Sequence, residues 1–328
     1  MNHLTKIVIV IVCFKVSLIS YAYSPEIAHQ PLITLSMSLY NKCHPNDKTY
    51  RDHKFREYIT IGDIAMDKGK KKLPGWHKVS FANGSLSLLK RPLNWHFYNP
   101  DRQHLSKQGW IDKSQKRLWE RANSEFLKYK NKDKRSFSLG GIIHLIEDAG
   151  VPGHVIPVYH GPVAAKLTGK FSHLVNYMKD HVDKGVIKDT IDSIEPDVLT
   201  LSHEIMSDLA AMCVFANINE SPDQIRDKLA RKTLSLITQT VPDCKNGKFY
   251  WQDFWVMPKG NAYFGKYNIG NGPLFGQKGV LKKTFSDGET KSCIFRDRDP
   301  RYAALVRQLH IETIKADLKI LRWASFKF

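Results

Sequence analysis

Residues 138–154, which read SLGGIIHLIEDAGVPGH, constrain the fold of this chain more than any other segment. Drawn as a helix, the segment carries apolar side chains on nearly every side, which is typical of a helix buried among other elements. Two adjacent glycines, Gly140 and Gly141, permit a neighbouring element to approach the backbone closely. The segment therefore predicts a central helix that other elements must cover.

Three residues of this segment have side chains that bind metal ions. His144 and Asp148 are four residues apart, so a helix projects both from one face. We expect Pro152 and Gly153 to end the helix and His154 to follow from the turn beyond it. Such a His–Asp pair also occurs on many helices without a metal, but a buried pair needs a partner for its charge. Imidazole nitrogens and carboxylate oxygens at about 2.0–2.2 Å suit zinc.

The rest of the chain also favours helices. Apolar residues recur at helical spacing in residues 26–40, 50–66, 114–129, 166–184, 194–216, 222–240 and 299–323. Pro31 indicates that the first of these helices starts nearby. No alternating pattern runs long enough to predict a large sheet. We therefore expect an all-α fold.

The N-terminal residues 1–22 have the pattern of a secretory signal peptide. Lys6 precedes an apolar run over residues 7–14, and small residues end the segment at Ala22. The apolar run is too short to span a bilayer comfortably. We expect the mature chain to start near Tyr23 and to be secreted or periplasmic. Four cysteines then remain, with three possible pairings; Cys244–Cys293 is attractive because it would staple the irregular segment between them.

The charge of the chain indicates an anionic partner. The formal net charge is +18, or +16 once Lys6 and Lys15 leave with residues 1–22. Such a field attracts nucleic acid, anionic lipid surfaces or phosphorylated small molecules without distinguishing among them. Residues 246–299 interleave aromatic side chains with lysines, which suits a membrane interface, base stacking or an ordinary cover over the helices. A helix follows this segment, so it is predicted to be a loop-rich insertion before the last helix.

The central segment also resembles a known family. Leu139-Gly140 followed by His144-x3-Asp148-x5-His154, with Pro152 two residues before the last histidine, resembles the zinc-dependent phospholipase C family and its relatives, the zinc single-strand nucleases. The resemblance implies a single multi-helix phospholipase C-like domain over residues 23–328. It also implies a cluster of two to three zinc ions.

Further ligands follow from the resemblance. It implies that His29 binds zinc beside the amine of the mature N-terminal residue, Tyr23. The segment NWHFYNPD supplies His96, with His77 as the weaker competitor. The segment IGDIAMD ends in the carboxylate ligand that the resemblance favours.

That carboxylate is Asp67, with Asp63 four residues earlier as the alternative. The third zinc position would use His154 and His173, and here the chain departs from the family. The family has a carboxylate four residues after its last histidine, but the residues in that place after His160, His173 and His181 are Ala164, Tyr177 and Gly185. Asn176 or Asp180 would complete the site instead.

The resemblance implies a secreted hydrolase of phosphoric esters. Asp148 would bridge two zinc ions, and Asp67 would orient the attacking water. The leading hypothesis is a phospholipase C that acts on phospholipids at a membrane surface. The alternatives are a zinc single-strand nuclease or nucleotidase and a non-catalytic, zinc-stabilised binding protein. Nothing in the sequence calls for an obligate protein partner.

Overall fold

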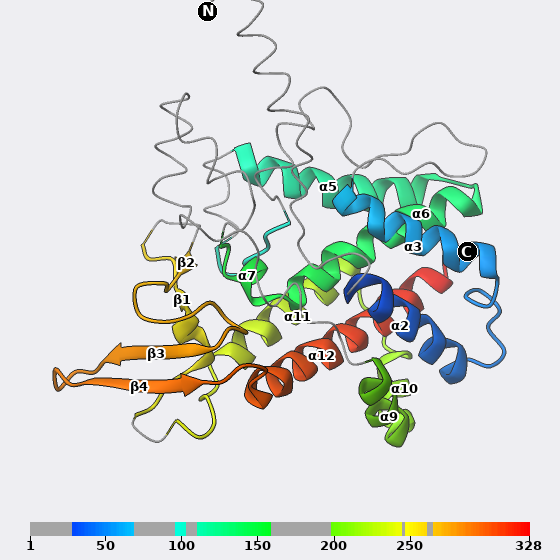
Figure 1. Ribbon diagram of the computed structural model, residues 1–328. Helices are drawn as coiled ribbons and strands as arrows, with labels where there is room; N and C mark the ends of the chain where they lie inside the picture. The colour runs from blue at the N-terminus through cyan, green and yellow to red at the C-terminus, as the bar shows by residue number, and fades with distance from the viewer. Residues whose placement is uncertain (1–27, 69–95, 103–109, 159–197, 245–246, 261–264) are drawn as a thin grey trace, which may run out of the picture.

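The computed structural model describes residues 28–68, 96–102, 110–158, 198–244, 247–260 and 265–328 (Figure 1). Within these ranges nine α-helices dominate and strands are few, which confirms the predicted all-α class. The helices are α2 Gln30–Cys43, α3 His53–Lys68, α5 Trp110–Lys128, α6 Lys132–Glu147, α7 Pro152–Val155, α9 Val198–Ser207, α10 Leu209–Phe215, α11 Pro222–Ile237 and α12 Pro300–Ser325. The predicted signal peptide, residues 1–22, and the predicted helix at residues 166–184 lie outside the described ranges.

Helix α6 lies at the centre of the helical body, as the sequence predicts. Every residue from Ser136 to Glu147 is buried, and α6 contacts α3, α5, α11 and α12. Asn131 caps its start by accepting a hydrogen bond from the backbone N–H of Lys134. Surrounded in this way, α6 carries its polar side chains into the interior.

The exit of α6 differs from the prediction in one respect. The regular helix ends at Glu147, before the proline, and Asp148–Gly150 forms a 3-10 turn, η4. Pro152 does not end α6 but lies in the first turn of the short helix α7, where its missing N–H costs no hydrogen bond. His154 therefore comes from a second short helix, reoriented by the extended backbone of Val151.

Two glycines allow α3 and α6 to pack backbone against backbone. A Cβ atom added at Gly140 would lie 2.0 Å from the carbonyl oxygen of Ile59, and one added at Gly62 would lie 2.0 Å from that of Phe137. The predicted close approach at Gly140 is thus confirmed, with α3 as the neighbour. The contact fixes α3, and with it Asp63, against the polar face of α6.

The insertion before the last helix forms a second apolar cluster. It contains the 3-10 helix η6 Trp251–Phe254 and two antiparallel pairs: β1 Trp255–Val256 with β2 Lys266–Tyr267, and β3 Gly279–Thr284 with β4 Thr290–Phe295. Among its aromatic residues, the following are buried: Phe249, Trp251, Phe254, Trp255, Tyr267, Phe275 and Phe295. These seven serve as a packed cover and not as a membrane or base-stacking surface. The β3–β4 hairpin projects from the helical body (Figure 1).

Two disulfides connect segments that are distant in the sequence. Cys43 at the end of α2 bonds Cys213 in α10, and Cys244 after α11 bonds Cys293 in β4. The second is the pairing favoured from the sequence, and it closes the insertion as expected.

The predicted helix at residues 194–216 is in fact two helices, since Asp208 interrupts it and caps α10 through the N–H of Ala211.

A helix that crosses a bilayer must be both long and apolar. Among the residues that the structure describes, no helix is long and apolar enough to do so.

We predict that Gly140→Ala lowers the free energy of unfolding by about 1–3 kcal/mol, because its Cβ would collide with backbone atoms of α3. Urea denaturation of the purified chain measures this. Gly270→Ala is the matched control, since nothing lies within 4 Å of a Cβ there; it should leave stability unchanged or raise it by up to about 1 kcal/mol. Equal behaviour of the two variants would contradict the close contact.

Candidate metal centre

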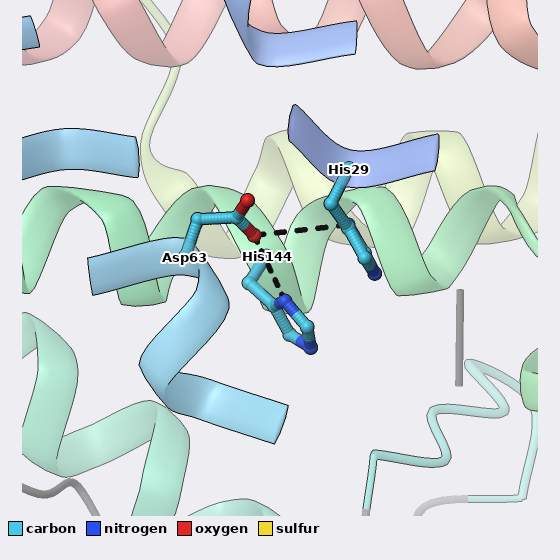
Figure 2. A group of neighbouring side chains, drawn as sticks. All are labelled: His29, Asp63 and His144. Carbon is cyan, nitrogen blue, oxygen red and sulfur yellow. Dashed lines mark hydrogen bonds and ion pairs between the residues drawn. The ribbon is translucent and has the colours of Figure 1, made fainter. Parts of the chain in front are cut away.

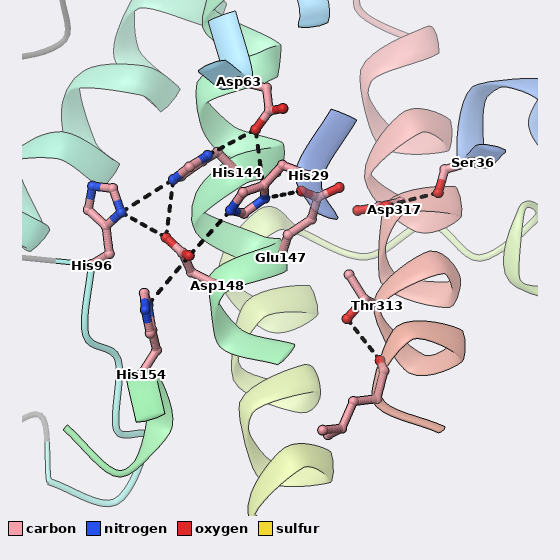
Figure 3. Close-up of polar contacts among 11 residues, drawn as sticks. His29, Ser36, Asp63, His96, His144, Glu147, Asp148, His154, Thr313 and Asp317 are labelled. Carbon is pink, nitrogen blue, oxygen red and sulfur yellow. Dashed lines mark hydrogen bonds and ion pairs between the residues drawn. The ribbon is translucent and has the colours of Figure 1, made fainter. Parts of the chain in front are cut away.

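Five separate segments bring histidines and carboxylates together in the interior. His29 precedes α2, Asp63 lies in α3, His96 precedes α5, His144 lies in α6, and Asp148 with His154 follows α6. Each side chain is at most 4% exposed. Figure 3 shows the group gathered around Asp148 at the end of the central helix. Burial of so many ionisable groups is costly unless they share a charged or metal partner.

One oxygen of Asp148 faces a pair of histidines. Asp148 Oδ2 lies 2.9 Å from His96 Nδ1 and 3.4 Å from His144 Nε2, and these two nitrogens are 3.3 Å apart. Two ligands bound at about 2.0–2.1 Å to a tetrahedral ion are separated by about 3.3–3.4 Å. The three atoms therefore have the spacing of ligands around one ion, and the three residues form one of two buried groups that could hold a metal.

The other oxygen of Asp148 faces a second pair of histidines. Asp148 Oδ1 lies 3.7 Å from His29 Nε2 and 3.4 Å from His154 Nδ1 (Figure 3). A carboxylate with each oxygen directed at a different histidine pair has the arrangement of a bridging ligand. The predicted bridging position of Asp148 is therefore geometrically available.

Asp63 and Glu147 contact the ring nitrogens of His144 and His29 that face away from Asp148. Asp63 Oδ1 is 2.9 Å from His144 Nδ1 and 3.8 Å from His29 Nδ1, and the His29 and His144 rings stack with centroids 4.0 Å apart (Figure 2). His29, Asp63 and His144 form the other group that could hold a metal. Glu147 Oε2 makes a short hydrogen bond with His29 Nδ1. Such carboxylates fix which ring nitrogen is protonated and which is available to a metal.

The electrostatics of the cluster favour a neutral imidazole at His29. Burial lowers the pKa of His29 well below its ordinary value, and the neighbouring His144, His96 and His154 lower it further. A neutral imidazole is the form that binds a metal ion. Burial also raises the pKa of Glu147 well above its ordinary value, with further contributions from Asp317, Asp63 and Asp148.

The structure brings together most of the residues that the sequence singled out. The five that converge are His29, His96, His144, Asp148 and His154. Asp63, the alternative to Asp67, is the carboxylate of α3 that contacts His144. Asp67 lies one turn further along α3, and its side chain is outside the described part of the chain. The predicted ligands Tyr23, His173 and Asp180 also lie outside the described ranges, as do His77 and Asn176.

Two buried acids of this region were missed. Glu147 and Asp317 are both fully buried, and Ser36 Oγ donates a hydrogen bond to Asp317 Oδ2 at 2.8 Å. Glu147 could have been found because it is charged and lies in the otherwise apolar run before Asp148. Asp317 could have been found because it lies on the apolar face of α12, beside Ile314 and Leu321 in helical spacing.

An arginine holds the segment that carries His96. The guanidinium of Arg226, in α11, lies 4.0 Å from the ring centre of Tyr98 and 3.7 Å from that of Trp119. The backbone N–H of Tyr98 in turn donates to the carbonyl of His154. The contacts of Arg226 thus connect α11 and α5 to Tyr98, which is two residues from the candidate ligand His96.

Comparison with known proteins adds no relative. No family model, no curated protein and no solved structure matches the chain. Its function must therefore be argued from the side chains of the site.

We predict that Arg226→Met lowers the free energy of unfolding by about 1–3 kcal/mol, because it removes a buried cation held between two rings. Chemical denaturation measures the change. Arg231→Met, on the same helix, is the control: Arg231 is about half exposed and pairs with Asp101 and Asp227 at the surface. That variant should change stability by no more than about 0.5 kcal/mol, and a larger loss than for Arg226 would contradict the prediction.

Proposed function

We propose that this chain is a zinc-dependent hydrolase of phosphoric esters, of the phospholipase C type and with a phospholipase C-like helical bundle. One observation carries the proposal: Asp148 directs one oxygen at His96 and His144 and the other at His29 and His154. This arrangement supports a site for two ions that share one carboxylate.

The donor set fits zinc better than other common divalent cations. It consists of imidazole nitrogens with carboxylate oxygens, whereas calcium and magnesium prefer oxygen ligands alone. The spacing of His96, His144 and Asp148 suits tetrahedral coordination. The lowered pKa of His29 keeps that imidazole neutral and ready to bind.

Each residue has a defined part in this proposal. His96 and His144 would hold one ion and His29 the other, with Asp148 common to both. Two such ions, when bound, polarise a phosphate ester and lower the pKa of water toward neutrality. Asp67 would orient the attacking water. The amine of Tyr23 would add a ligand beside His29, and His173 with Asp180 would complete a third position beside His154.

Two further features support an exported enzyme with an anionic substrate. Both disulfides join cysteines of the predicted mature chain, and disulfides persist in oxidising compartments. The net charge of +18 favours encounter with a phospholipid surface or a nucleic acid. The phospholipid is preferred because the His96 segment resembles the bacterial phospholipases most.

We predict that removing the metal destabilises the protein. Zinc at about 1,000 times its dissociation constant should raise the free energy of unfolding by about 4 kcal/mol per site, because it binds only the folded chain. Thermal unfolding with zinc and with a chelator measures this. Asp148→Asn should lose most of the difference, whereas His203→Ala, at an exposed position of α9, should keep it. An unchanged melting temperature on addition of zinc would contradict the metal centre.

Hydrolysis of phosphatidylcholine vesicles and of single-stranded DNA, each with zinc and with chelator, tests the substrate. We expect chelator-sensitive release of the phosphorylated head group, and a loss of more than about 100-fold in Asp148→Asn, since even outer partners of a ligand contribute 10- to 100-fold. Activity on DNA alone would replace the phospholipase with the nuclease. Zinc binding without turnover of either substrate would identify a binding protein.

A further inference from the structure

Glu147 is the one buried acid of the centre that faces away from Asp148, although the two are adjacent in the sequence. Its side chain is fully buried, and Oε2 makes a short hydrogen bond with His29 Nδ1. Figure 3 shows it on the far side of the His29 ring from Asp148. A buried carboxylate in contact with the back of a candidate ligand needs an explanation beyond packing.

The contact determines which nitrogen of His29 faces the centre. A neutral imidazole has one N–H donor and one acceptor nitrogen. A metal bound through Nε2 requires the proton on Nδ1, where Oε2 of Glu147 can accept it, and Nε2 lies 3.7 Å from Asp148 Oδ1. His29 stands at the start of α2, where its side chain makes no capping bond. The helix itself therefore does not orient the ring.

A second buried acid lies close to Glu147. The charge of Asp317 of α12 contributes to raising the pKa of Glu147, and Ser36 of α2 donates a hydrogen bond to Asp317 Oδ2 at 2.8 Å. Glu147, Asp317 and Ser36 are all fully buried. The chain of contacts starts on α2, crosses α12 and α6, and returns to the residue that precedes α2. The position of the His29 ring therefore depends on how α2, α6 and α12 pack together.

We propose that Glu147 is a positioning residue for one metal position only, the one that uses His29 with Asp148, and that Asp317 and Ser36 lie behind Glu147. This assignment rests on the proposed two-ion centre. Asp63 stands in the corresponding place behind His144, at 2.9 Å from its Nδ1. Asp63 is farther from His29, at 3.8 Å from its Nδ1, so Glu147 is the nearer carboxylate of His29. Losing Glu147 leaves the contacts of His96 and His144 with Asp148 in place.

Metal titration of the full chain tests the assignment without any need for activity. Zinc is titrated against a competing chelator, and cobalt(II) is titrated separately while its visible absorption is recorded. The wild-type chain should bind at least two equivalents. Glu147→Ala should weaken one equivalent by about 10- to 100-fold, the usual effect of removing a carboxylate behind a histidine ligand, and should keep the affinity of the rest.

Two other variants separate positioning from general destabilisation. Glu147→Gln keeps an oxygen that accepts from Nδ1–H, so its weakened equivalent should bind more tightly than that of Glu147→Ala. Asp253→Asn makes the same carboxylate-to-amide change at an acid that pairs with Lys283 in the second apolar cluster. It should bind both equivalents as the wild type does, and circular dichroism confirms that each variant is folded.

The outcomes are distinct. Two wild-type equivalents with an unchanged Glu147→Ala, or with both equivalents weakened equally, overturn the assignment and leave the metal centre intact. A wild-type chain that binds fewer than two equivalents overturns the centre and the assignment together. Two bound equivalents without hydrolysis of any phosphodiester overturn the proposed activity but not the role of Glu147.

Discussion

Burial of Asp148 among four histidines is the interaction on which the rest of the structure depends. A carboxylate in the interior of a helical body is unfavourable unless other groups compensate its charge. Here each oxygen faces two imidazoles from different parts of the chain. Segments more than 100 residues apart in the sequence must therefore meet at one point, which constrains the packing of the elements that bear them.

Packing of the central helix makes that meeting possible. Gly62 and Gly140 bring α3 and α6 into backbone contact, which places Asp63 at 2.9 Å from His144. The change from α6 to the 3-10 turn at Asp148 and then to α7 directs His154 back toward the same carboxylate. A straight helix through residue 154 would carry His154 about 9 Å further along its axis than Asp148. The break in the helix between Glu147 and Pro152 is therefore needed to bring His154 beside Asp148.

The buried apolar side chains form two separate clusters. The helical cluster surrounds the centre, while the insertion packs its aromatic side chains into a separate cluster against α11 and α12. The Cys244–Cys293 disulfide closes that insertion. The described aromatic residues of the insertion are largely internal, so the proposed phosphorylated substrate would be attracted by the positive charge of the chain.

The sequence by itself determined the helical class, the buried central helix and the candidates His144, Asp148 and His154, because helical periodicity and a His–Asp pair in an apolar run are local signals. His29 and His96 were candidates only through the resemblance to zinc-dependent phospholipases C. Only the tertiary structure decided that Asp63 contacts His144, that Glu147 lies behind His29, and that Asp317 and Ser36 lie behind Glu147. These contacts join α2, α3, α6 and α12. Spacing along a helix says which face a side chain occupies, but which side chain it meets depends on how the helices pack.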